Sequence, residues 1–203
     1  MRPLVFFIYL MAVTGCGQSP GPVVLARADY DTEAMTQAAM KEFDRDGNGM
    51  IEGAELDACP ALKAAVGGID TNRDKKISTD ELRARFEAYK ATNAGSVAVP
   101  VTLTLDRVPL ADATVTFVPE VCMGGATKEA TGKTGTDGMV RSFTVDGKEC
   151  LGLQPGLYRI KVSKADTNGK ELVPARYNTQ TPLGAEVFGA RGGGAVTLSL
   201  TSR

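Results

Sequence analysis

A twelve-residue segment, residues 44–55, constrains this chain more than any other feature of its sequence. Oxygen-bearing side chains occupy its first, third, fifth and twelfth positions: Asp44, Asp46, Asn48 and Glu55. Gly49 stands at the sixth position, where such a loop must turn sharply, and Met50 can add its carbonyl at the seventh. Alternate residues of a tight loop point inward, and a hard cation such as calcium takes about six to eight oxygens. The spacing therefore predicts a calcium-binding loop.

A second twelve-residue segment, residues 70–81, repeats this pattern. Its ligand positions carry the side chains of Asp70, Asn72, Asp74 and Glu81. Lys76 stands at position 7 and can offer its backbone carbonyl. The two segments together resemble the EF-hand family, in which loops work in pairs joined by a short antiparallel contact between the position-8 residues. The resemblance implies that Ile51 lies against Ile77 and that the chain binds one or two Ca²⁺ ions.

The second loop departs from the family pattern at position 6, where Lys75 replaces the usual glycine. A residue other than glycine must there accept left-handed backbone angles, at a cost of roughly 1 kcal/mol. Arg73 and Lys76 add further positive charge to this loop, whereas loop one is mostly acidic. Because ligand charge tunes calcium affinity, we expect loop one to be the tighter site. Loop two either binds weakly or fills only once loop one is occupied.

Apolar residues at helical spacing surround both loops and predict a small all-α domain over residues 29–92. The members of this pattern are Met35, Ala39, Met40, Phe43, Leu62, Val66, Ile69, Leu82, Phe86 and Tyr89. Pro60 suits the first turn of a short helix between the loops. The simplest interpretation of these side chains is a hydrophobic core.

The N-terminus begins with a positive charge and an apolar run of signal-peptide length, too short for a confident membrane span. The run ends at residues 13–16, Val-Thr-Gly-Cys, which resemble the lipobox of bacterial lipoproteins. The resemblance implies a signal peptide at 1–15, a lipid on Cys16 and a flexible tether over 16–28. It also implies an exported protein anchored in the bacterial cell envelope, at the outer membrane or facing the periplasm, because Gly17 is not acidic. An ordinary secretory peptide or a retained N-terminal anchor are the alternatives.

Three cysteines remain besides Cys16. An oxidising compartment permits disulfides, and Cys122 and Cys150 are the expected pair because both fall in the second half of the chain. Sequence alone does not fix connectivity, so two free thiols remain the alternative. Cys59 is expected to be a buried apolar residue. The chain has no Cys-x-x-Cys spacing and no histidine, so an ordinary zinc site is excluded.

From about residue 95 the hydrophobic pattern changes from helical to alternating, which predicts β-strands. The expected strands are residues 97–99, 101–105, 113–118, 139–145, 157–163, 185–188 and 195–200. Glycine-rich turns separate them, and no helical pattern intervenes. Short strands at this density predict an antiparallel β-sandwich over residues 95–203. The expected fold class is thus α+β, with the helical domain followed by the β-domain.

Several motifs in this second half resemble the carboxypeptidase-regulatory-like, transthyretin-related domains. They are the strand and turn of residues 103–117, the Thr-x-x-Asp-Gly turn of 134–138, the Leu-x-Pro-Gly-x-Tyr segment of 153–162, and residues 174–179. The last resembles short planctomycete-type lipoproteins that carry this module. The resemblance covers roughly half of the chain. It implies an extracellular spacer or binding domain, and the family name carries no peptidase activity. Arg107 replaces the family's usual glycine at the first turn.

The residue inventory argues against an enzyme. The chain lacks a histidine base, a Gly-x-Ser-x-Gly elbow and a phosphate-binding glycine loop. Asp137 precedes a glycine in a predicted turn, where aspartate is ordinarily structural. Arg176 and Tyr177 are expected to cover a sheet edge. A net charge of −1 gives no electrostatic reason to expect a nucleic-acid partner.

These expectations combine into a non-enzymatic, calcium-binding, membrane-anchored lipoprotein in which calcium is structural. The β-domain then serves as a spacer, or binds a protein or carbohydrate. The alternative is a calcium-responsive accessory subunit of a surface enzyme or transporter. A calcium sensor exposes a methionine-rich groove when loaded, and Met35, Met40 and Met50 provide only a sparse one.

Overall fold

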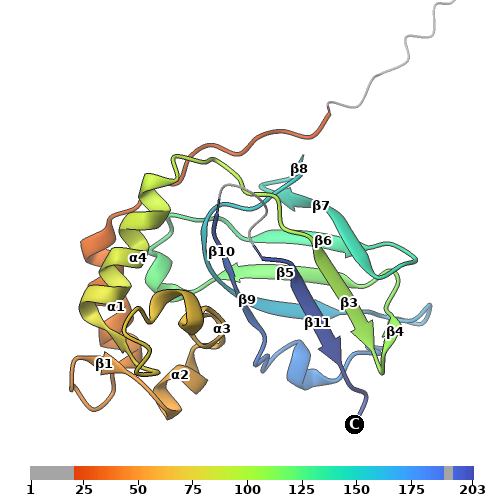
Figure 1. Cartoon of the computed structure of the whole chain (residues 1–203). Coiled ribbons are helices and arrows are strands. Elements are labelled where there is room, and N and C mark those ends of the chain that lie inside the picture. The colour runs from red at the N-terminus through yellow and green to blue at the C-terminus, as the bar shows by residue number, and fades with distance from the viewer. Residues whose placement is uncertain (1–20, 190–193) are drawn as a thin grey trace, which may run out of the picture.

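The computed structural model describes residues 21–189 and 194–203. Four α-helices lie beside one large, curled and mostly antiparallel β-sheet (Figure 1). This arrangement confirms the predicted α+β class. The predicted signal peptide at residues 1–15 and the lipid-attachment residue Cys16 lie outside the described residues.

The helices all fall within residues 29–92. They are α1 (Thr32–Phe43), α2 (Ala54–Ala58), α3 (Pro60–Ile69) and α4 (Thr79–Ala91). Local sequence sets where they begin. The Asp31 side chain caps α1 by accepting from the Ala34 amide, Pro60 opens α3, and Ser78 forms a reciprocal capping box with Glu81 at the start of α4.

The large sheet has nine strands in the order β10-β9-β5-β6-β7-β3-β11, with β4 paired to β3 and β8 to β7. The strands are β3 (Val101–Leu105), β4 (Val108–Pro109), β5 (Thr114–Pro119), β6 (Ala130–Thr134), β7 (Met139–Val145), β8 (Lys148–Cys150), β9 (Gly156–Ser163), β10 (Gly184–Val187) and β11 (Val196–Leu200). Two 3₁₀ helices, η1 (Val121–Met123) and η2 (Ala175–Tyr177), interrupt them. The last strand differs from the prediction, because β11 runs parallel to β3. An alternating pattern fixes which side chains face inward, but it does not fix strand direction.

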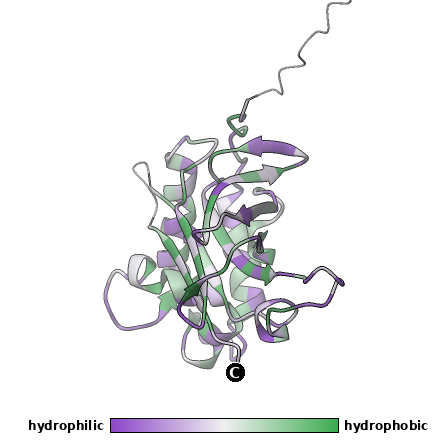
Figure 2. Ribbon diagram, turned by 90° about the vertical axis from the view of Figure 1, so that its right-hand side faces the viewer, coloured by the Kyte–Doolittle hydropathy of each residue, from purple (hydrophilic) through white to green (hydrophobic). Residues whose placement is uncertain are grey.

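Two groups of buried residues hold the fold together. One lies within the sheet, where alternate residues point inward and Phe117 meets Phe143 edge-on at a centroid distance of 5.6 Å. The matching alternation of hydrophobic and hydrophilic residues along the strands can be followed in Figure 2. The other, here called the helical core, contains the apolar faces of the four helices. The sheet-side residues Cys122, Met123 and Leu157 also belong to this helical core.

The predicted bridge between Cys122 and Cys150 is not formed. Both residues are free, fully buried thiols, as is Cys59. Cys122 lies in the helical core, whereas Cys150 lies in the core of the sheet. The prediction assumed that two cysteines in one half of the sequence share one core, and the η1 helix carries Cys122 across to the helices instead.

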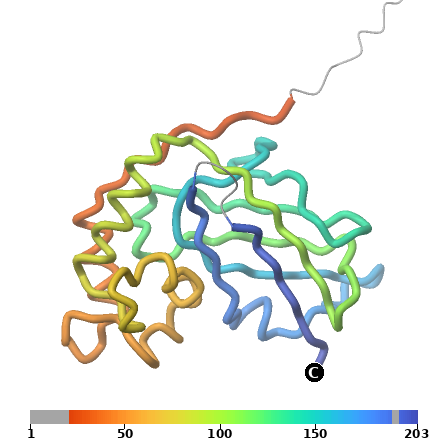
Figure 3. Tube along the Cα trace, in the orientation of Figure 1, coloured from red at the N-terminus to blue at the C-terminus, as the bar shows by residue number. Residues whose placement is uncertain are grey.

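Part of the segment predicted as a flexible tether, from residue 21 onward, lies against the sheet. From residue 21 the chain follows the sheet before it enters α1, and Figure 3 shows this red beginning of the described chain crossing above the strands. The Val23 amide donates to the Glu149 carbonyl at 2.7 Å, and the Gln154 side chain donates to the Ala26 carbonyl at 3.0 Å. Leu25 packs on the sheet core. Backbone pairing and apolar contact therefore fix part of the segment predicted as tether.

Candidate metal centre

Two short strands hold the predicted loops side by side. They are β1 (Met50–Ile51) in loop one and β2 (Ile77–Ser78) in loop two, and they pair antiparallel. Ile51 lies opposite Ile77, and both side chains are fully buried. The predicted contact between the two position-8 residues is confirmed. It anchors both loops to the helical core beneath them.

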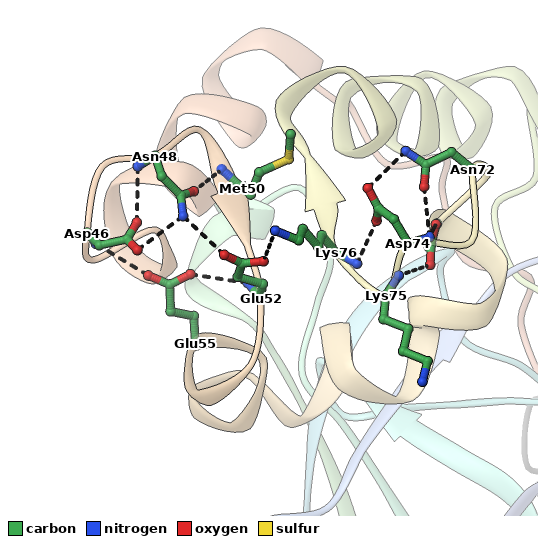
Figure 4. A network of polar contacts seen from close by, with 10 residues as sticks. Asp46, Asn48, Met50, Glu52, Glu55, Asn72, Asp74, Lys75 and Lys76 are labelled. Atoms are coloured by element: carbon green, nitrogen blue, oxygen red, sulfur yellow. Dashed lines mark hydrogen bonds and ion pairs between the residues drawn. The ribbon is translucent and has the colours of Figure 1, made fainter.

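The loop-one carboxylates converge. Ligand oxygens of Asp44, Asp46 and Glu55 all lie within 4.8 Å of one another. Asp44 follows the end of α1, and Glu55 lies in the first turn of α2, so the two helices bring the ends of the loop together. Figure 4 shows Asp46 and Glu55 of this triad with their polar contacts. This is the spacing that a single bound cation needs.

Backbone amides orient these carboxylates. The Asp44 carboxylate accepts hydrogen bonds from the amides of Gly47 at 2.8 Å and Gly49 at 3.0 Å. The Glu55 carboxylate accepts from Arg45 at 2.7 Å and, through its other oxygen, from Glu52 at 3.1 Å. The loop is therefore folded around its acidic side chains, and the amides fix the carboxylate positions.

Loop two repeats these contacts at the equivalent positions. Asp70 accepts from the amides of Arg73 at 2.6 Å and Lys75 at 2.8 Å. Glu81 accepts from Thr71 at 2.9 Å and Ser78 at 3.0 Å. The two loops thus share one hydrogen-bonding scheme. Across the described part of the chain, however, only the loop-one triad of carboxylates meets the close spacing. Loop two also has three carboxylates, but its middle one is Asp74 at position 5, and position 3 holds the amide Asn72.

Both loops need left-handed backbone at the same two positions. In loop one these are Gly47 and Gly49, with φ of 71° and 83°. In loop two they are Arg73 and Lys75, with φ of 65° and 66°. The strain expected at Lys75 is confirmed. The prediction overlooked Arg73, which the glycine at the equivalent position of loop one could have indicated.

Hydrogen bonding keeps Glu81 ionised. Partial burial raises the pKa of this carboxyl, but hydrogen bonds from Ser78 and Thr71 outweigh that effect and lower the pKa to about 2. Metal ligands must be deprotonated, so the carboxylate is ready to bind at neutral pH.

One contact joins the two loops through their side chains. The Lys76 ammonium lies 2.5 Å from a carboxylate oxygen of Glu52, at position 9 of loop one. The other oxygen of Glu52 accepts from the Asn48 side chain at 3.2 Å. The prediction assigned Lys76 only a backbone role and did not include Glu52 among the ligands. An acidic residue at position 9, facing a lysine in the paired loop, was the available signal.

The donor set fits a hard divalent cation. The convergent groups are carboxylate oxygens, with no thiol or imidazole among them. Oxygen-only donors suit calcium or magnesium, and the softer metals prefer sulfur or imidazole. In a bound state, the Asp44, Asp46 and Glu55 carboxylates would hold the ion, and Asn48 and the Met50 carbonyl are the further candidates.

The polar residues considered in the β-domain have local partners instead of a shared site. Asp137 accepts from the Met139 amide at 3.1 Å and pairs with Arg141 at 2.6 Å, as expected of a turn aspartate. Arg176 donates to the Thr201 carbonyl at 2.5 Å, and the Tyr177 hydroxyl lies 3.2 Å from the Thr201 hydroxyl. Both therefore hold the C-terminal segment in place.

Comparisons with protein-family models, with curated proteins and with solved structures gave no match. Within residues 21–189 and 194–203, no helix has the length and apolar character needed to cross a bilayer.

Proposed function

We propose that residues 29–92 form an EF-hand pair that binds one or two Ca²⁺ ions. The observation that carries this proposal is the convergence of the Asp44, Asp46 and Glu55 oxygens within 4.8 Å, in a loop whose hydrogen bonds recur in its neighbour. The paired strands supply the joint between the two loops.

Calcium in this proposal is structural. The apolar surface that a calcium sensor opens toward a target is already occupied, because Cys122, Met123 and Leu157 from the sheet side lie in the helical core. Met35 is itself only 3% exposed. An ion that binds the folded loops and not the unfolded chain stabilises the fold by mass action, by about 2.7 kcal/mol at a hundredfold excess over Kd.

The same proposal places the protein in the bacterial envelope, held by a lipid on Cys16. The β-domain is then a transthyretin-like sandwich that serves as a spacer or binding module without catalysis. Its support is the motif set of the second half of the chain and the curled sheet that those motifs occupy.

Calorimetric titration of the full chain, purified in detergent and stripped with a chelator, tests the calcium proposal. We expect uptake of one or two ions at millimolar concentration or below, in the range of extracellular EF-hand modules at about 10⁻⁴–10⁻³ M or tighter. The absence of any heat or bound calcium at several millimolar would contradict it.

Metabolic labelling with palmitate tests the anchor. We expect label in the unmutated protein and none in Cys16→Ser, which should persist as uncleaved precursor. Cys59→Ser is the matched control, because Cys59 is fully buried and should leave the labelling unchanged. Equal labelling of the unmutated chain and Cys16→Ser would rule the lipid out.

A further inference from the structure

The side chain of Lys76 crosses from loop two to loop one. In the antiparallel pair of β1 and β2, Ile51 lies opposite Ile77, so the residue after Ile51 and the residue before Ile77 are also neighbours across the strands. Those two residues are Glu52 and Lys76, whose charged groups meet at 2.5 Å (Figure 4). The backbone register of the loop pair therefore creates this ion pair.

The Lys76 ammonium lies in the field of acidic groups from both loops. Its hydrogen bond and charge interaction with Glu52 come first in raising its pKa, and the charges of Asp74 and Asp46 raise it further. Its nearest partner is thus in loop one, while Asp74 belongs to loop two. The neighbouring Lys75 is exposed, and the described residues include no ion-pair partner for it.

We propose that Lys76 is a built-in counter-ion of loop one, one that calcium must displace from Glu52 on binding. This inference rests on the proposed calcium function and adds a residue that sets the affinity of the first site. Glu52 occupies position 9, which in loops of this kind contributes to the ion, often through a water. An ammonium already paired with that carboxylate reduces the negative charge that the loop offers to a cation.

The size of this effect follows from the exposure of the pair. The side chains of Lys76 and Glu52 are 43% and 30% exposed, so solvent screens their attraction. Partly exposed ion pairs change an equilibrium by about two- to fivefold. Lys76 is therefore expected to tune loop one within that range without deciding whether it binds.

Calcium titration of two matched variants tests the proposal. Lys76→Gln should tighten binding to loop one by about two- to fivefold. Lys75→Gln removes the same charge at the adjacent position. The Lys75 side chain forms no ion pair within the described chain, so this variant should change the calcium affinity less. Equal effects of the two variants, or weaker binding by Lys76→Gln, would overturn the proposal, because general charge would then explain the result.

A calcium-free experiment separates this proposal from the proposed function. Urea unfolding in EDTA is compared for the unmutated chain, Lys76→Gln, Glu52→Gln and the double variant. We expect each single change to lower the midpoint and the double variant to lower it by less than the sum. If the effects of the two substitutions are strictly additive, the ion pair does not exist in solution and the proposed role of Lys76 as a counter-ion is wrong. If the effects are coupled but the chain takes up no calcium, the ion pair exists, and both the proposed displacement by calcium and the proposed calcium function are wrong.

Discussion

Single residues decide how much backbone strain each of the two loops carries. Arg73 and Lys75 hold left-handed backbone, with φ near 65°, where loop one has glycines. Each such residue costs roughly 1–2 kcal/mol relative to its relaxed geometry. They stay there because their amides donate to Asp70, and that scheme is common to both loops. Loop two therefore adopts the same backbone shape as loop one, but with a conformational free-energy cost that the glycines of loop one avoid.

This difference predicts a ranking of the two sites. Glu55→Gln removes a carboxylate from the converged triad and should weaken the tighter calcium site by at least about tenfold, since a lost charged ligand costs roughly 1.5–3 kcal/mol. Glu81→Gln acts on the strained and more basic loop and should change the tighter site by less than about threefold. Calorimetry on both variants, which are matched in chemistry and loop position, measures the difference. A larger loss in Glu81→Gln would reverse the ranking.

Much of the candidate site could be predicted at this scale. Ligand spacing in a loop is local, so Asp44, Asp46 and Glu55 could be selected from the sequence, as could the contact of Ile51 with Ile77. The course of a long flexible side chain is not local. The sequence could place Lys76 in loop two, but the strand register decides that its ammonium ends beside Glu52.

At the scale of elements, the periodicity of the sequence predicted whether a segment is a helix or a strand better than it predicted which elements pack against one another. The buried face of α4, with Leu82, Phe86 and Tyr89, follows the helical spacing of the sequence. The parallel pairing of β11 and the position of η1 depend on contacts between distant segments, which periodicity does not encode. The error about Cys122 has the same origin.

One polar cluster joins the helices to the sheet. Arg85 on α4 makes two hydrogen bonds to the Glu186 carboxylate on β10, at 2.5 and 2.6 Å, and its guanidinium lies 4.0 Å from the Phe188 ring centroid. Burial and the charge of Glu186 raise the pKa of Tyr89, whose hydroxyl remains protonated and donates to the same carboxylate at 2.5 Å. The helix that leaves loop two is therefore bonded directly to an edge strand.

At the scale of the whole molecule, the sheet has a core of its own, but the helical core extends onto the sheet. Residues of η1 and β9 lie in the helical core, and α3 packs on β10. Stabilising the loops therefore stabilises part of the sheet as well. Calcium should act beyond the residues that bind it.

Hydrogen exchange with and without calcium checks this consequence. We expect calcium to slow amide exchange in α3 and α4 and also in β9 and β10, because opening these strands disrupts the helical core. Strand β8 contacts neither the loops nor the helices among the principal element contacts and serves as the internal control. Protection confined to residues 29–92 would show instead that helices and sheet open independently.

The docked start of the chain has a consequence for orientation. Val23 is fixed beside β8, and seven residues of chain from Cys16 to Val23 reach at most about 25 Å. In Figure 1 the chain leaves the fold beside β8, at the opposite end from the paired loops. A lipid on Cys16 would therefore hold the β8 end of the molecule close to the bilayer. The paired loops would then face the surrounding medium and bind ions at a distance from the lipid headgroups.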